Sequence, residues 1–442
     1  TLALQSIERN MPANLERVKI LLMDGEVQQQ WFCKWEALVG ADKKIAFQQF
    51  LQDENCPERV LELAGEPLLL YLLAAMHRDG ELNSETFAGS SETQAKILIY
   101  QKSLEWVLTK QRPEWLQRDI TEQHTEDLRR ILTEAGLCVI QSGGECAPML
   151  MIEQRLKGDE TAEFLEAARE RIGENPLRNA LAAFYLQPGR ETGSRETGSV
   201  EFAHKSFSEF LFAERLKESL ESWTEARRRG RGFLIKEEQM HEEIYDLFGY
   251  GGLTPEVVEY LMSLVTESDD IPLVKLFQRL DDFYLDWCDG KFIDDYTDTL
   301  PQKKSRQLHE QGIKLGQRQV DIYAGLNVMI LLLELNRNGW GEDDFKQQII
   351  YYLFRVIHYS DVIKLGTFDS LVGRYFSRIN LKGVYLYGVN FSNLNLCDAN
   401  LRQANLSQEN LRNENLREAK LRKENIRKEK NSKVKLRGKQ IS

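Results

Sequence analysis

The sequence lacks several features that mark whole classes of protein. No G-x-x-x-x-G-K-[ST] motif occurs among its 442 residues, so nothing in the chain can cradle nucleotide phosphates as a P-loop does. The longest apolar run, residues 68–76, is about half of what a bilayer-spanning helix needs, and no signal peptide opens the chain. We therefore expect a cytoplasmic protein without membrane contact, and no ATP hydrolysis by this chain alone.

Cysteine and histidine are scarce and scattered. The six cysteines form no C-x-x-C pair, and no histidine stands at ligand spacing from them. They indicate reduced thiols rather than a disulfide framework. The acid-rich stretch 267–298 lacks the alternating oxygen ligands of a calcium loop, and no Ser, Cys or Asp stands in a nucleophile motif. The sequence therefore predicts no metal site and no catalytic residues.

What the chain does contain is a five-residue repeat near its C-terminal end. An apolar residue recurs at every fifth position from Leu381 to Ile426. A period of five fits neither a helix, at 3.6 residues per turn, nor a strand, at two, so each unit must form one side of a coil. The residues at this third position of each unit are Leu381, Leu386, Phe391, Leu396, Leu401, Leu406, Leu411, Leu416, Leu421 and Ile426.

This segment resembles the pentapeptide-repeat family. The resemblance implies a right-handed, quadrilateral β-solenoid over residues 377–428, with the third and first residues of each unit pointing inward. The first positions are apolar up to Ala404 and then become Glu409, Glu414 and Glu424. A carboxylate inside a narrow solenoid would be a buried, unpaired charge. Beyond residue 408 two interpretations therefore remain open: further coils, or a helix or frayed tail.

The charge of the chain is unevenly distributed. The net charge is −11, yet residues 417–442 carry eleven bases against three acids. Such a basic tail can bind phosphates or an acidic partner. A solvated terminus is the more common role of such a segment. We therefore treat nucleic acid as the less favoured partner and a protein at the repeat surface as the favoured one.

The middle of the chain predicts helices. Residues 57–64 form a short helix stopped by Gly65, and Pro67 opens a second helix that closes at Gly80 and is apolar on nearly all sides. Ser91 starts a long helix that ends before Pro113, and others follow at 125–137 and 161–171.

A β-hairpin follows these helices. Residues 182–186 and 200–203 read as strands around a Gly- and Ser-rich loop that contains the tandem RETGS RETGS. A helix then begins at Ser206, which has capping-box spacing to Glu209. Helices followed by two strands around a loop are typical of a winged helix.

Two patches, ELAGEPLLLYLLA at 62–74 and VEFAHKSFSEFLFAERL at 200–216, resemble NACHT-type NTPases of the STAND class. The resemblance implies that Pro67 packs near the adenine of a bound nucleotide. It also implies that His204, in an H-x-[ST]-F-x-E-F pattern, contacts the β-phosphate of ADP and holds the protein inactive. Pro67 as a plain helix start and His204 as a structural donor are the alternatives. The phosphate-binding motif of that family is absent, so ADP or ATP would bind only in a longer parent.

We therefore predict a mostly α-helical chain followed by a β-solenoid. Its function would be the regulatory and sensor portion of a bacterial STAND signalling NTPase that forms oligomers on activation. The alternative is a non-enzymatic pentapeptide-repeat protein that mimics DNA or binds nucleic acid through its basic tail. Since the first residue is Thr, we expect a fragment. The predicted parts are a remnant of the NTPase core at 1–26, a helical domain at 27–115, a winged helix at 116–220, a second helical domain at 221–376, the solenoid at 377–428 and a basic tail at 429–442.

Overall fold

The computed structural model confirms a mostly helical chain in the part that it describes. The described residues form two compact units, Thr1–Trp106 (unit 1) and Val107–Ser442 (unit 2). The five-residue repeat, the basic tail and the first 21 residues lie outside the described part. Described are residues 22–54, 56–87, 92–109, 125–143, 146–157, 186–188, 199–202, 205–227, 232–294 and 298–338.

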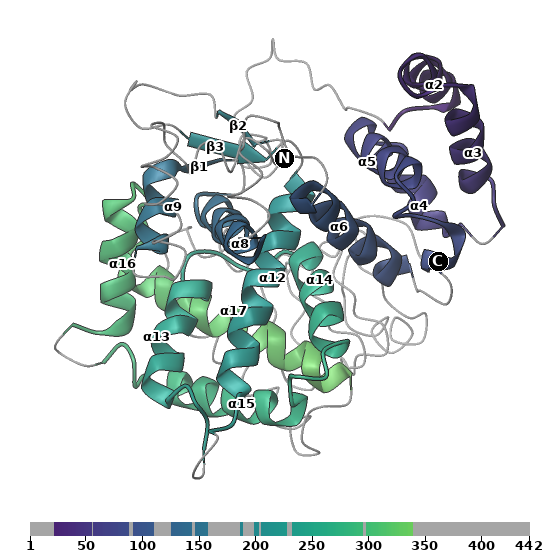
Figure 1. Cartoon of the computed structure of the whole chain (residues 1–442). Coiled ribbons are helices and arrows are strands. Elements are labelled where there is room, and N and C mark those ends of the chain that lie inside the picture. Colours follow the sequence, from purple (N-terminus) through teal and green to yellow (C-terminus); the bar gives the residue numbers. More distant parts are fainter. Residues whose placement is uncertain are drawn as a thin grey trace, which may run out of the picture. The chain divides into compact units, whose positions relative to one another are not determined.

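The described part of unit 1 consists of helices (Figure 1), and aromatic side chains cluster in its core. The rings of Phe32 and Trp35 lie 6.1 and 5.7 Å from that of Phe47, which stacks on Phe50 at 6.0 Å. All four side chains are buried, so large rings build this small core. Its elements are α2 (Gly25–Val39), α3 (Ala41–Leu51), α4 (Glu58–Leu63), α5 (Pro67–Arg78), the 3-10 turn η2 (Ser84–Phe87) and α6 (Glu92–Thr109), whose last residues belong to unit 2.

The two short helices expected around Pro67 are confirmed. α4 ends one residue before its C-cap, Ala64, and α5 begins at Pro67, where the missing N–H of proline costs no helical hydrogen bond. Seven of the twelve residues of α5 are buried, as its apolar run predicts. Asp79, which follows α5, accepts a hydrogen bond of 2.9 Å from the indole of Trp106 and so ties α5 to α6.

The described residues in the first half of unit 2 form helices and a small antiparallel sheet. The sheet has the order β1-β3-β2, so the first strand pairs with the last and the last two form a hairpin. The expected hairpin is therefore confirmed, but its first strand begins at Leu186, where the predicted strand 182–186 ends, and includes two residues predicted as loop. The elements are α8 (Thr125–Gln141), β1 (Cys146–Pro148), α9 (Met149–Leu156), β2 (Leu186–Pro188), β3 (Ser199–Phe202) and α12 (Lys205–Thr224). The helix expected at 161–171 and the hairpin loop lie outside the described residues.

α8 and α12 pack closely because of a glycine. A Cβ at Gly136 of α8 would lie 2.8 Å from the Cβ of Leu211 and 3.1 Å from the backbone of α12. Any side chain at position 136 would therefore push the two helices apart. α12 also packs on α14, so it is central to unit 2.

The second half of unit 2 is a set of helices arranged on α17, whose residues are almost all buried. Asn327 of α17 donates to the carbonyls of Phe248 and Gly251 and accepts from the N–H of Leu253, which fixes the loop between α13 and α14. The elements are α13 (Glu237–Phe248), α14 (Pro255–Thr266), α15 (Leu273–Cys288), α16 (Leu300–Glu310) and α17 (Gln317–Arg337).

One local expectation is wrong. α12 begins at Lys205, so Ser206 is its second residue and not its N-cap. Glu209 turns to the side chains of Lys205, at 2.7 Å, and Thr254, at 3.4 Å. Since Glu209 is only 3% exposed, pairing with a cation outweighs the capping box that the spacing suggested.

Candidate functional site

Pro67 is the one predicted nucleotide contact that the structure describes. It is the first residue of α5, and its ring is exposed. The two leucines that follow by two and three positions, Leu69 and Leu70, are fully buried. The apolar residues of α5 thus anchor the helix, while Pro67 faces outward. This exposed ring could pack against a planar group, and it equally fits a proline that only starts the helix.

His204 lies outside the described residues, in the short connection between β3 and α12. The structure therefore leaves the predicted role of His204 untested. The residues after it are described: Phe210 is fully buried, and its ring meets that of Tyr260 edge-on at 6.0 Å. Phe210 and Glu209 fasten the start of α12 to the region of α14, so these two members of the H-x-[ST]-F-x-E-F pattern have packing roles of their own.

A buried network of ion pairs holds the elements next to this connection. The carboxylate of Glu134 on α8, 2% exposed, pairs with Arg155 of α9 at 2.6 Å and with Arg215 of α12 at 2.7 Å. Arg155 reaches on to Asp246 of α13 at 2.7 Å, and Asp246 also pairs with Lys304 of α16 at 2.7 Å. We call these five residues the α8–α16 ion network.

The charges of this network stabilise one another. Burial alone would raise the pKa of Asp246, but Arg155 and Lys304 outweigh it and hold that pKa far below its ordinary value. The pKa of Glu134 is lowered in the same way, since Arg155, Arg215 and Arg130 outweigh its burial. Burial lowers the pKa of the Lys304 ammonium, an effect that Asp246 opposes. The ion pairs join α8, α9, α12, α13 and α16, so the network positions these helices.

The sequence could not reveal this network. Its partners are 21 to 91 residues apart, and none of them belongs to a local motif. The only local signal is Arg130, which pairs with Glu134 across one helical turn at 2.9 Å.

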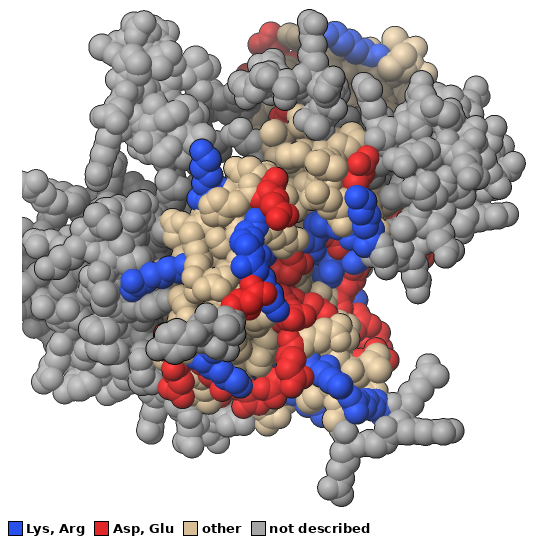
Figure 2. Space-filling model, turned by 90° about the vertical axis from the view of Figure 1, so that its left-hand side faces the viewer, with Lys and Arg blue, Asp and Glu red and all other residues tan. Residues whose placement is uncertain are grey.

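The face of the molecule that carries α9 and α16 shows mixed charge (Figure 2). Acidic and basic side chains are intermixed there among the described residues. A phosphate backbone is bound by a surface with an excess of positive charge. Among the residues described on this face, the charge distribution does not favour nucleic acid.

Comparison with known proteins identifies one part of the chain. Residues 371–403 and 399–423 match the family of pentapeptide repeats, with eight copies. The predicted repeat is thus confirmed, and it continues past residue 408 to 423, beyond the point where glutamate replaces the small first residue. No curated protein and no solved structure matches the chain. Among the described residues, no helix is long and apolar enough to cross a membrane. The C-terminal segment from 371 to 423 is therefore a pentapeptide-repeat region.

Proposed function

We propose that the chain is the regulatory and sensor portion of a STAND signalling NTPase whose pentapeptide repeats bind a protein partner. The repeats indicate a repeat-protein or protein-interaction role, because each unit of such an array contacts only its neighbours and builds a surface rather than a pocket. The partner would bind along this surface, and the helical units would pass the signal on, with oligomer formation as the output in the cytoplasm.

The observation that carries the regulatory part of the proposal is the element order in unit 2. A winged helix has a three-stranded antiparallel sheet in which the first strand pairs with the last and the last two form the wing. The order β1-β3-β2, with α8 and α9 before the hairpin and α12 after it, supports that arrangement. His204 would then stand between the wing and the N-terminus of α12, where main-chain N–H groups and the helix dipole favour a phosphate.

The nucleotide would belong to a parent protein that supplies the missing phosphate-binding motif. Pro67 would pack on the adenine and His204 would contact the β-phosphate of ADP in the inactive state. By itself the chain should neither bind ATP tightly nor hydrolyse it. Calorimetry of the chain with ATP checks this, and binding in the micromolar range would contradict it.

The decisive experiment uses the parent protein. The proposal requires a G-x-x-x-x-G-K-[ST] motif encoded upstream of Thr1, and a reading frame without one would contradict it. In that parent, His204→Ala should speed ADP release about ten- to hundredfold, as expected for a charge-assisted contact of roughly 1.5 to 3 kcal/mol. Release of a fluorescent ADP measures this.

Glu201→Gln is the matched control, because Glu201 is exposed on β3 three residues before His204. This variant should release ADP at the rate of the unchanged protein. Equal release rates for His204→Ala and Glu201→Gln would show that His204 has only a structural role.

The second candidate function is nucleic-acid binding, which only the basic tail favours. If the eleven bases of residues 417–442 bind phosphates, affinity should fall steeply with salt, show no sequence preference and vanish when these residues are deleted. Filter binding of a random duplex at 50 and 200 mM salt measures it. A DNA mimic would instead need an acidic repeat surface, which the basic end of this one does not supply.

A further inference from the structure

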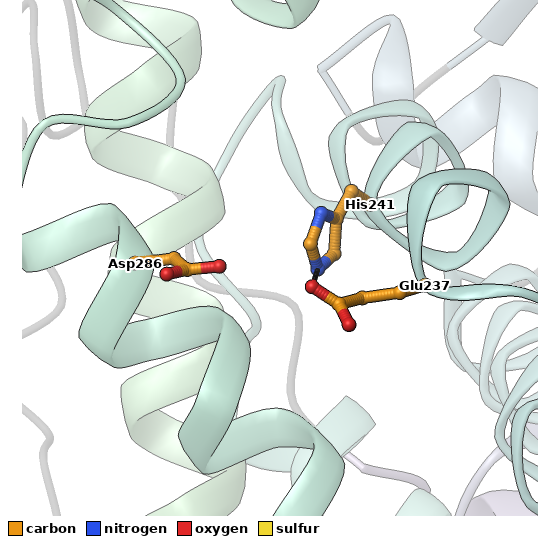
Figure 3. A group of neighbouring side chains, drawn as sticks. All are labelled: Glu237, His241 and Asp286. Carbon is orange, nitrogen blue, oxygen red and sulfur yellow. Dashed lines mark ion pairs between the residues drawn. The ribbon is translucent and has the colours of Figure 1, made fainter.

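Three ligand-type side chains meet between two helices of unit 2. Glu237 and His241 lie one turn apart on α13, and Asp286 lies on α15 (Figure 3). One ligand atom from each lies within 4.8 Å of the other two. In the figure the His241 ring and the Glu237 carboxylate face each other, and the Asp286 carboxylate points toward them from the opposite helix.

His241 is the fixed member of this group. It is 6% exposed, and the rings of Phe283 and Phe292 meet it edge-on at 5.3 and 4.9 Å. Its Nε2 faces Glu237 Oε1 at 3.9 Å, which is too long for a hydrogen bond. The aromatic packing thus holds a buried ring nitrogen in place toward the two carboxylates, without a close polar contact at that atom.

The two carboxylates have room to move. The side chain of Glu237 is 63% exposed and that of Asp286 is 33% exposed. Ligand atoms around a tetrahedral Zn²⁺ lie roughly 3.3 Å apart, given metal–ligand bonds of about 2.0 to 2.1 Å. Shifts of about 1 to 1.5 Å by the carboxylates would therefore close the group around an ion without disturbing His241.

A lysine currently supplies the positive charge at this place. Lys291 Nζ lies 2.5 Å from Asp286 Oδ2 and 3.8 Å from Glu237 Oε1. The side chain of Lys291 is 53% exposed, so it can swing into solvent. The same two carboxylates would then be available to a metal cation, and Lys291 is its competitor.

From this arrangement we propose that Glu237, His241 and Asp286 form a binding site for a first-row divalent transition cation such as Zn²⁺. One imidazole with two carboxylates suits Zn²⁺ better than Mg²⁺ or Ca²⁺, which prefer oxygen ligands alone. A bound ion would link α13 to α15 and release Lys291. Spacing along the chain gives no hint of the site, because Asp286 comes 45 residues after His241.

The test is titration of the full chain with Zn²⁺. Binding is measured by calorimetry and by a rise in melting temperature that EDTA reverses. One Zn²⁺ per chain should bind at this site, and Asp286→Asn should weaken it at least tenfold. Lys291→Gln should tighten it about thirtyfold, the factor for about 2 kcal/mol of repulsion between a unit charge and a divalent ion near 4 Å in water. Mg²⁺ should give no rise in melting temperature.

Glu242→Gln is the control, since Glu242 is an exposed acid directly beside His241 and pairs with Lys303 away from the group. It should bind Zn²⁺ as the unchanged chain does. His241→Asn should abolish Zn²⁺ binding. If this substitution of a buried residue prevents folding, Asp286→Asn tests the same site. The proposal is overturned if Zn²⁺ does not raise the melting temperature, if Asp286→Asn binds as well as Glu242→Gln, or if Lys291→Gln binds no more tightly.

Discussion

At the scale of single residues, one helix contact in unit 2 depends on a residue without a side chain. Gly325 lies in the middle of α17, where glycine is a poor helix former. A Cβ there would lie 2.3 to 2.6 Å from the indole carbons of Trp287 on α15. The indole N–H of Trp287 donates to the carbonyl of Asp321, on α17 as well, at 3.0 Å. The glycine is therefore explained by the large ring that crosses it.

The first prediction follows from this contact. Gly325→Ala should destabilise unit 2 by about 1 to 3 kcal/mol, because overpacking outweighs the gain in helix propensity. Urea unfolding followed by far-UV circular dichroism measures it. Gly316→Ser is the control on the same helix, since its Cβ would meet only Gln319 Oε1 at 3.6 Å and serine caps helices well. A Gly325→Ala variant as stable as Gly316→Ser would contradict the close contact.

At the scale of elements, the α8–α16 ion network joins five helices through side chains rather than through the sheet. Arg155 is 9% exposed and Lys304 3% exposed, while Asp246 keeps 30% of its side-chain surface exposed. Removing one partner of a buried pair leaves the other charge uncompensated, which costs more than the pair itself contributes. The network therefore makes the relative placement of these helices sensitive to each member.

The second prediction concerns Asp246 and pH. Asp246→Asn should destabilise unit 2 by about 3 kcal/mol at pH 7, because Arg155 and Lys304 lose their shared partner. The folded-state pKa of Asp246 lies below its ordinary value of 3.8, so its stabilisation is present above that pH and is lost as the pH falls toward the folded-state pKa. Urea midpoints at pH 7, 4 and 3 should therefore fall more steeply for the unchanged chain than for the variant.

Two further variants sharpen this test. Glu242→Gln breaks only an exposed pair, with a side chain 61% exposed, and should change stability by less than about 1 kcal/mol. Adding Lys304→Met to Asp246→Asn should recover part of the loss, because the buried ammonium is then removed as well. A double variant less stable than Asp246→Asn alone would argue against an electrostatic cause.

The third prediction concerns the repeat, where the family match covers both residues in question. If the solenoid forms with third positions inward, Phe391→Ala should cost about 3 to 5 kcal/mol, as for a large core side chain. Leu416→Ala should cost much less, because the neighbouring first positions are glutamates that would resist burial. Thermal unfolding measures both variants. Equal losses of stability for Phe391→Ala and Leu416→Ala would show that the repeat tolerates glutamate at the first position of its units.

At the scale of the whole molecule, the sequence predicts elements better than it predicts contacts. The predicted helix start at Pro67 was correct, because proline acts locally on the helix it opens. The start of α12 was predicted one residue late, and its Glu209 pairs with Lys205 of the same helix and accepts a hydrogen bond from Thr254 of another element. Local chemistry thus fixes where helices begin unless a distant partner competes.

Sites were predictable only where a motif stands in one stretch of sequence. The five-residue repeat is of this kind, and the family match confirms it. The α8–α16 ion network and the group of Glu237, His241 and Asp286 depend on which helix faces which, and that information is carried by apolar packing spread over the chain. No spacing rule could bring Asp286 to His241 before the pairing of α13 with α15 was known.

The division into two units gives the last prediction. Phe47 is fully buried among the rings of unit 1, whereas Gly325 and Trp287 belong to unit 2, and each unit encloses a core of its own. Calorimetry should therefore show two transitions. Phe47→Ala should lower the melting temperature of only one transition, because it reduces the free energy of unfolding of unit 1 by about 3 to 5 kcal/mol. Gly325→Ala should lower the melting temperature of only the other transition. The double variant should show both shifts, each as large as in the single variant, since sites that share no partner add. A single transition that both substitutions lower would mean that the two cores unfold as one.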